Sequence, residues 1–149
     1  IELLPATTFL DDLLPDCGHV CGPKPGKRVI EDAAFGFKIA KEMSRLDIGQ
    51  TVVVKKGTVL AVEAFEGTNK AIKRGGELGR GDAVVVKVSK PNQDLRFDVP
   101  CIGPDTIETA ASSSVSAIIV EANKTLLLGK NEIEISAERN GVTVYAYKE

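Results

Sequence analysis

The fold is decided by residues 50–64, QTVVVKKGTVLAVEA, in which two runs of β-branched residues flank the pair Lys56-Gly57. Gln50 to Lys55 and Val59 to Ala64 are both rich in valine, which is common in strands. A short glycine-containing link between two such runs is typical of a β-hairpin. We therefore expect two antiparallel strands joined by a tight turn.

Strands and helices alternate after this hairpin. Further apolar strands are expected at Ala83 to Val88, Ala117 to Glu121 and Val142 to Tyr147. Helices are expected at Glu31 to Leu46, Asn69 to Leu78, Thr106 to Ala111 and Asn131 to Arg139. Such alternation is typical of parallel strands joined by crossover helices. The predicted fold class is α/β, with a mixed sheet, a hairpin at the front and crossover helices in the second half.

Several turns and helix ends are expected from local residue types. Thr68 is predicted to cap the helix that follows it, and Gly79 to end that helix. The glycine-rich segment Arg74 to Gly81 is interpreted as a mobile turn rather than a phosphate loop. Gly49 is interpreted as the stop of the first helix. Residues 15–25 are predicted to be turns because proline and glycine recur there.

Composition restricts the class of protein. The chain has 149 residues, 43% hydrophobic and 27% charged, which predicts a single globular domain over residues 1–149. A net charge of −2, no tryptophan and 5% aromatic residues argue against nucleic acid as a partner. No apolar run is long enough to span a bilayer, and three cysteines fit a reducing cytosol rather than a disulfide framework.

The stretch SKPNQDLRFDVPCIGP, residues 89–104, is the strongest candidate for chemistry. Cations able to hold phosphate oxygens stand at Lys87, Lys90 and Arg96, and carboxylates stand at Asp94 and Asp98. Carboxylate oxygens are suitable ligands for magnesium, and one of them can instead orient a water molecule. Three prolines stiffen the loop.

An extended conformation over Leu95–Val99 would place Asp94, Arg96 and Asp98 on one face and the apolar residues on the other. That arrangement suits a charged cleft. The alternative interpretation is a solvated edge strand whose charges pair with one another.

A second candidate is the segment Glu63 to Asn69, where a strand meets the start of a helix. Backbone N–H groups at a helix N-terminus favour anions, so Thr68 is a candidate phosphate contact. Glu63 and Glu66 are candidate metal ligands. The alternative interpretation of this segment is a capping turn with Gly67. Gln50 is interpreted either as a contact to a polar ligand or as part of the link that follows the first helix.

The spacing of Cys17, His19 and Cys21 suggests zinc only weakly. A structural zinc site needs four ligands, and the remaining cysteine is Cys101. His19 is also the sole histidine, so any histidine-dependent triad would have to use it.

Three motifs together resemble the LpxI-type UDP-2,3-diacylglucosamine pyrophosphatases. They are DIGQTVVVKKGTVLAVEAFEGTN, KVSKPNQDLRFDVPCIGPDT and VEANKTLLL. The resemblance runs in order from about Phe9 to the C-terminus, and the aspartate–arginine loop is its most distinctive part.

The resemblance implies Mg²⁺-dependent hydrolysis of UDP-2,3-diacylglucosamine to UMP and 2,3-diacylglucosamine 1-phosphate, in lipid A biosynthesis of Gram-negative bacteria. An essential acidic residue is expected at Asp94 first and at Asp98 second, with Arg96 beside them. The expected substrate contacts are Lys87, Lys90, Gln93, Thr68 and Gln50, and the expected metal ligands are Asp94, Asp98, Glu63 and Glu66.

The resemblance is to the C-terminal catalytic half of the family, and a Rossmann-like N-terminal half is expected to be absent. If substrate binds between the two halves, this chain is expected to bind it weakly or to lack turnover. Asn69 also stands where the family pattern has aspartate. The resemblance places the protein in the cytoplasm, with membrane lipid contacted only peripherally. Two alternatives stay open: a non-catalytic α/β module that binds a phosphorylated ligand or a partner domain, and a structural domain that completes a homodimer.

Overall fold

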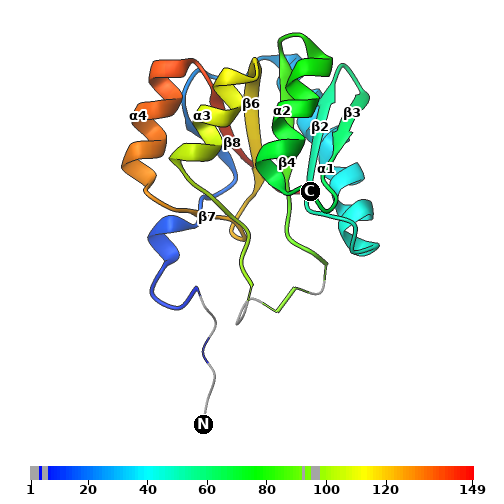
Figure 1. Cartoon of the computed structure of the whole chain (residues 1–149). Helices are drawn as coiled ribbons and strands as arrows, with labels where there is room; N and C mark the ends of the chain where they lie inside the picture. Colours follow the sequence, from blue (N-terminus) through cyan, green and yellow to red (C-terminus); the bar gives the residue numbers. More distant parts are fainter. Residues whose placement is uncertain (1–3, 5–6, 92, 95–97) are drawn as a thin grey trace.

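The computed structural model describes residue 4 and residues 7–91, 93–94 and 98–149. Within these residues, the centre is a six-stranded mixed sheet in the order β1-β8-β6-β4-β2-β3 (Figure 1). The strands are β1 (Gly18–Cys21), β2 (Thr51–Lys55), β3 (Thr58–Val62), β4 (Ala83–Lys87), β6 (Val115–Glu121) and β8 (Thr143–Tyr147). β4, β6 and β8 are parallel, and antiparallel pairs flank them. The predicted α/β class and the front hairpin are confirmed.

Helices cover both faces of the sheet (Figure 1). They are α1 (Lys27–Arg45), α2 (Thr68–Gly79), α3 (Pro104–Ser112) and α4 (Lys130–Asn140). Phe37 of α1 shares a buried cluster with Val84 of β4. Val85, the next residue of that strand, shares the other cluster with Ile72 of α2 and Ile107 of α3. Successive side chains of a strand point to opposite faces, so α1 packs on one face and the other three helices pack on the opposite face.

Coverage of both faces explains why the central strands are apolar throughout. Residues 52–54, 84–86 and 118–120 are at most 1% exposed, whichever face they point to. A strand buried on both faces has no solvent side on which polar residues would alternate. Full burial of each of these valines and isoleucines contributes about 1.5–3 kcal/mol.

The structure corrects two element predictions near the N-terminus. α1 begins at Lys27, four residues before the expected Glu31, and its added first turn includes Val29, which packs against the core cluster of Phe37. β1 was not expected, since residues 15–25 read as turns. It is a short strand that pairs antiparallel with β8 at the edge of the sheet, with an irregular register between His19 and Cys21. Pairing with β8, rather than local sequence, makes it a strand.

The glycine-rich segment 74–81 is not a turn, because Gly75 and Gly76 lie inside α2. A Cβ added to Gly75 would lie 2.4 Å from Cβ of Val53 in β2. Glycine therefore lets the helix approach the sheet more closely than any other residue would allow. The capping prediction was also wrong: Gly67 is the N-cap, and Thr68 is the first helical residue.

The loop that leaves β4 is anchored at its far end by a small two-stranded parallel sheet, β5 (Cys101–Ile102) and β7 (Leu126–Leu127). The backbone N–H of Leu126 also donates to the carbonyl of Pro100 at 2.9 Å. The segment between β4 and α3 is therefore held at both ends.

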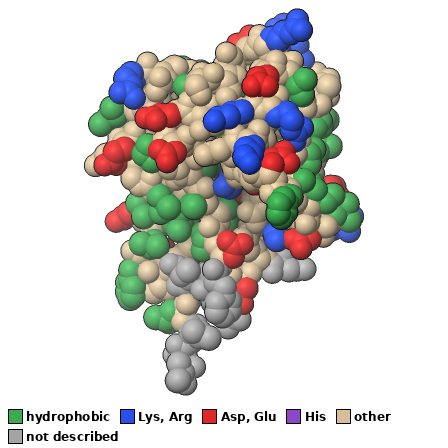
Figure 2. All heavy atoms as spheres, viewed as in Figure 1, with side chains coloured by type: hydrophobic (Ala, Val, Ile, Leu, Met, Phe, Trp, Pro, Cys, Tyr) green, Lys and Arg blue, Asp and Glu red, His purple; other side chains and the backbone are tan. Residues whose placement is uncertain are grey.

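The described residues contain no helix long and apolar enough to cross a membrane. On the face that carries α2, α3 and α4, acidic and basic side chains are interspersed (Figure 2). This mixture agrees with the small net charge of the chain.

Candidate functional site

Most of the predicted site residues that the structure describes gather at one edge of the sheet. Lys87 is the last residue of β4, and Gln50 immediately precedes β2. β2 is antiparallel to β4, with Thr51 opposite Lys87, so the start of β2 lies beside the end of β4. Glu63 follows β3 and returns to this edge through its N–H bond to the Thr51 carbonyl (2.8 Å). We call it the carboxyl edge, because the parallel strands end there, and ligands of α/β sheets commonly bind outside such ends.

The first half of the site is organised by Glu63. One carboxylate oxygen accepts a hydrogen bond from the Thr68 hydroxyl (3.0 Å), and the other accepts one from the backbone N–H of Gln50 (3.3 Å). Lys87 donates from Nζ to the Thr68 hydroxyl oxygen (3.3 Å) and to the Cys101 carbonyl (3.0 Å). An ammonium and a carboxylate are therefore joined through one hydroxyl.

The second half is organised by Gln93. Its Oε1 accepts hydrogen bonds from Nε2 of Gln50 (3.2 Å) and from the backbone N–H of Lys90 (2.8 Å). Its Nε2 donates to Oδ2 of Asp98 (2.7 Å). The two halves meet at Gln50. A continuous chain of hydrogen bonds, which we call the polar chain, thus joins Lys87, Thr68, Glu63, Gln50, Gln93 and Asp98.

Gly49 supports the polar chain, although the sequence suggested only a helix stop. α1 ends at Arg45, and the residue with a left-handed φ near its end is Asp47, at 58°. A Cβ on Gly49 would lie 2.1 Å from the carbonyl oxygen of Glu63. Gly49 is therefore required for close approach of two backbone segments, which places Glu63 against Gln50. Only the packing reveals this role.

Asp47 is a second contributor that sequence reasoning missed. Its carboxylate pairs with the ammonium of Lys90, and this hydrogen bond and charge raise the pKa of Lys90 above its ordinary value of 10.5. The two residues line a hollow of about 200 Å³ together with Ser44, Arg45 and Pro91. Lys90 is thus an ion-paired, partly exposed cation near the start of residues 89–104.

Glu66 lies apart from the polar chain. Its carboxylate pairs with Arg74 of α2, and the hydrogen bond from Arg74 lowers the pKa of Glu66 below its ordinary value of 4.5. Glu66 would have to leave Arg74 to join a metal shell.

The aspartates of the loop are close along the backbone. The N–H of Asp98 donates to the carbonyl of Asp94 at 3.1 Å. Arg96 and the predicted alternation over residues 95–99 depend on residues 95–97, which lie outside the described part of the chain. Over the part that is described, no group of three or more His, Cys, Asp or Glu side chains is placed to hold a metal ion.

The described segment with Cys17, His19 and Cys21 is likewise not part of a group placed to hold a metal ion. Cys21 is 6% exposed and belongs to the core. Burial, reinforced by the charges of Glu134 and Glu138, raises the pKa of its thiol to about 11. Cys21 therefore packs as a core residue in this structure.

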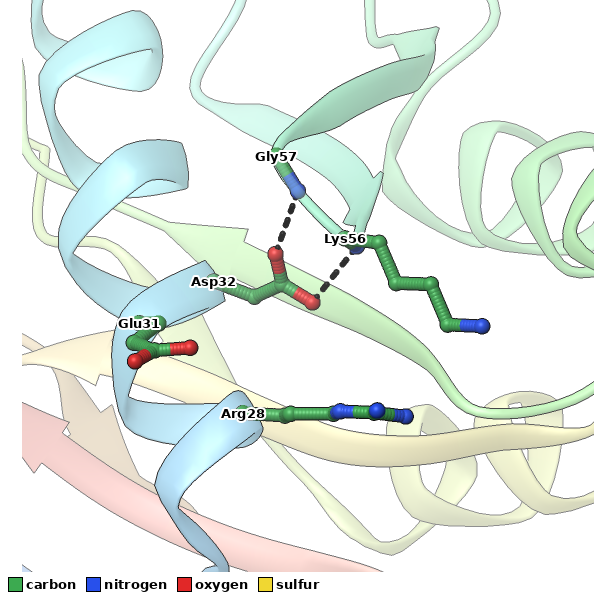
Figure 3. Close-up of a pocket in the computed structure, with 5 residues that line it drawn as sticks. All are labelled: Arg28, Glu31, Asp32, Lys56 and Gly57. Atoms are coloured by element: carbon green, nitrogen blue, oxygen red, sulfur yellow. Dashed lines mark hydrogen bonds between the residues drawn. The ribbon is translucent and has the colours of Figure 1, made fainter.

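The opposite edge of the sheet also carries a hollow, of about 440 Å³, lined by Arg28, Glu31, Asp32, Lys56 and Gly57. Asp32 accepts hydrogen bonds from the backbone N–H groups of Lys56 and Gly57, both at 2.8 Å, and so closes the hairpin turn (Figure 3). Arg28 and Lys56 extend in the same direction, away from Glu31 (Figure 3). This hollow is larger than the one beside Lys90, but it contains none of the predicted site residues, so volume alone does not locate the site.

The chain is similar to known proteins over nearly its whole length. The family model described as the LpxI C-terminal domain matches residues 16–145. The UDP-2,3-diacylglucosamine pyrophosphatase LpxI of Caulobacter vibrioides is 37% identical over 135 residues, which cover 85% of this chain and 48% of that protein. A 1-deoxy-D-xylulose-5-phosphate synthase of Psychromonas ingrahamii is 29% identical over 106 residues, covering 71% of this chain and 15% of that protein. The chain thus spans about half the length of its LpxI relative.

Proposed function

The chain belongs to the LpxI C-terminal domain family, and on that premise we propose that it hydrolyses the pyrophosphate of UDP-2,3-diacylglucosamine. Water adds to one phosphorus, the bridging P–O bond breaks, and the products are UMP and 2,3-diacylglucosamine 1-phosphate. The observation that carries the proposal is the polar chain, which joins a lysine, two carboxylates and two amides at the carboxyl edge. The LpxI relative, a named pyrophosphatase of this substrate, supports it.

The cations are proposed to bind the two phosphates. Pyrophosphate hydrolysis concentrates negative charge on the phosphate oxygens, and fixed positive charge stabilises the transition state most where it needs no rearrangement. Lys87 is held by Thr68 and Cys101, and Lys90 is held by Asp47. Arg96 is proposed as a third cation from the family resemblance. Gln50 and Gln93 supply amide hydrogen bonds to the same region.

Asp94 and Asp98 are proposed to be the acidic residues that the reaction requires. A carboxylate can hold and orient the attacking water or accept its proton, and such catalysis typically contributes 10²–10⁴-fold. Asp98 has a fixed direction, because Gln93 donates to its Oδ2. Asp94 is joined to it by the hydrogen bond from the backbone N–H of Asp98 to the Asp94 carbonyl.

We propose magnesium as the cofactor, with substrate phosphates completing its coordination. Carboxylates stand at Glu63, Asp94 and Asp98, although the described residues contain no group of three or more such side chains placed to hold a metal ion. Mg²⁺ is usually held by one or two protein carboxylates together with water and substrate phosphates. We propose that these residues, with Glu66 if it leaves Arg74, hold Mg²⁺, which would neutralise phosphate charge.

The biological setting follows from the same proposal. Its product would enter lipid A biosynthesis in a Gram-negative cell, and the reaction would take place in the cytoplasm beside membrane lipid. We propose no contact with nucleic acid.

The experiment is release of UMP from UDP-2,3-diacylglucosamine in detergent micelles, with and without Mg²⁺. Asp94→Asn and Asp98→Asn keep the shape of the side chain and remove its charge. We expect magnesium-dependent release by the wild-type chain and a loss of about 10²–10⁴-fold in at least one variant. Asp32→Asn at the opposite edge is the matched control and should retain activity.

Two results would contradict the proposal. Undiminished release by both aspartate variants would remove the loop from the chemistry. Substrate binding measured by calorimetry, with no release by the wild-type chain even after the N-terminal half of the family is added, would instead support a non-catalytic module that binds a phosphorylated ligand.

A further inference from the structure

Ser89, the second residue after β4, is held on all three of its polar groups. Its backbone N–H and its hydroxyl both donate to Oε2 of Glu121, each at 2.8 Å. Its carbonyl accepts a hydrogen bond from Nζ of Lys41 at 2.9 Å. The residue is 2% exposed. These hydrogen bonds restrain the backbone at the point where the chain leaves β4 and enters residues 89–104.

Glu121 and Lys41 also form a partly buried ion pair, in which the Lys41 side chain is 24% exposed. Nζ of Lys41 lies 3.0 and 3.1 Å from the two oxygens of Glu121, which is 5% exposed, and Lys124 adds a contact of 2.9 Å. Burial alone would raise the pKa of Glu121. The hydrogen bonds from Lys124, Ser89 and Lys41 outweigh it, so the pKa lies below its ordinary value of 4.5. The hydrogen bonds from Lys124, Ser89 and Lys41 therefore favour the charged form of Glu121.

Stability alone is a poor explanation for such a pair. Desolvating two charges costs about as much as their attraction returns, and well-packed apolar residues often replace a buried pair without loss. The better-supported use of such a pair is to specify one geometry. Here three separate elements meet, since Lys41 comes from α1, Glu121 ends β6, and Ser89 follows β4.

The backbone that the Glu121–Lys41 pair holds leads directly into the candidate site. Val88, between β4 and Ser89, donates its N–H to the Gln50 carbonyl at 2.9 Å. Lys90 follows Ser89 directly and donates its N–H to Gln93, which in turn donates to Asp98. The Lys90 N–H that bonds to Gln93 therefore lies one residue from the backbone that Glu121 and Lys41 hold.

We propose that Glu121 and Lys41 are positioning residues, which clamp Ser89 and thereby hold Lys90, Gln93 and Asp98 in place for phosphate chemistry. The clamp itself is independent of which reaction occurs. Its catalytic consequence rests on the proposed function. The test therefore has one readout that needs no activity and one that does.

The first readout is hydrogen exchange of backbone amides, followed by NMR. In Glu121→Gln, the charge that attracts Lys41 is lost while the shape is kept. We expect the amides of Ser89, Lys90 and Gln93 to exchange about tenfold faster or more, because hydrogen bonds to charged groups are the stronger ones. The amides of Val53 and Ile118 in the core should be unchanged.

The control is Asp32→Asn, which also neutralises a carboxylate that is 5% exposed and accepts two hydrogen bonds. It should speed exchange at Lys56 and Gly57 and leave the loop protected. Unchanged loop exchange in Glu121→Gln, or an equal increase over the whole chain, would overturn the clamp.

The second readout separates kcat from KM for UMP release. Glu121→Gln should lower kcat by about ten- to a hundredfold with a smaller change in KM, as expected when reacting groups are misplaced. The double variant Lys41→Met/Glu121→Leu replaces the pair with apolar groups and should remain folded, yet show the same loss and the same fast loop exchange. Full activity in the double variant would reduce the pair to a packing role. If the wild-type chain shows no release, alone or with the N-terminal half of the family added, the proposed function fails and the exchange data still decide the role of Glu121 and Lys41.

Discussion

The two edges of the sheet use the same kind of group for different purposes. Asp32 at the hairpin edge and Glu121 at the carboxyl edge are each 5% exposed, and each accepts hydrogen bonds from the backbone. Asp32 closes a two-residue turn between strands that are adjacent in sequence. Glu121 holds a serine 32 positions away and is surrounded by two lysines. A buried carboxylate therefore does not mark a site by itself, and what it restrains decides its role.

Matched lysines give the largest expected difference between the edges. Lys87 ends β4 and Lys55 ends β2, and each ammonium donates to a backbone carbonyl, at 3.0 and 2.7 Å. We expect Lys87→Met to lower UMP release by about a hundredfold or more, because a cation at the phosphates is lost. Lys55→Met should keep full release. Equal effects of the two variants on release, with equal thermal stability, would erase the distinction between the edges.

Gly49→Ala tests whether the carboxyl edge depends on close backbone packing. The added Cβ would lie 2.1 Å from the Glu63 carbonyl, so the two segments must separate. Overpacking of this kind typically costs about 1–3 kcal/mol. Urea unfolding should show that loss, together with weaker substrate binding. An unchanged unfolding midpoint would mean that Glu63 is not held by this contact.

Asp32→Ala tests the hairpin edge. Two backbone N–H groups lose a charged partner, which should lower the free energy of unfolding by about 1–3 kcal/mol. UMP release, measured below the melting temperature, should stay at the wild-type rate. A loss of release in a folded protein would assign this edge a part in function.

The stability of the carboxyl edge should depend on pH. The folded-state pKa of Glu121 lies below its ordinary value of 4.5. Its stabilisation is therefore complete above the unfolded-state pKa and is lost as the pH falls through the folded-state pKa. We expect the melting temperature of the wild-type chain to fall more steeply below pH 4.5 than that of Glu121→Gln. Parallel curves would show that Glu121 contributes no such linkage.

Thr51→Val should have the smallest effect. The Thr51 hydroxyl is fully buried, and it has no hydrogen-bond partner among the residues that the structure describes. Removing a buried polar atom without a partner is close to neutral or slightly stabilising, within about 1 kcal/mol. Thr51 lies opposite Lys87 but outside the polar chain, so release should also be unchanged. A larger loss in urea unfolding would show that the hydroxyl is engaged.

Sequence reasoning chose several residues that the structure brings together, but it did not find the residues that hold them in place. Lys87, Gln93 and Asp98 were chosen for their residue types, and the structure joins all three in one polar chain. The residues that hold them, such as Asp47 and Glu121, were not chosen. Each lies more than thirty positions from its partner, and a single sequence carries no signal for contacts at that distance.

By itself, the sequence determined the central strands, the hairpin and the α/β class, because runs of β-branched residues and helical spacing act over a few neighbouring positions. Family membership likewise follows from ordered local motifs. The tertiary structure decided that residues 18–21 form a strand and that Gly49 and Gly75 permit close packing. It also decided that Glu121 meets Ser89 and Lys41. These features depend on where the sheet places distant segments, and the energy that selects them comes from contacts made only when the chain is folded.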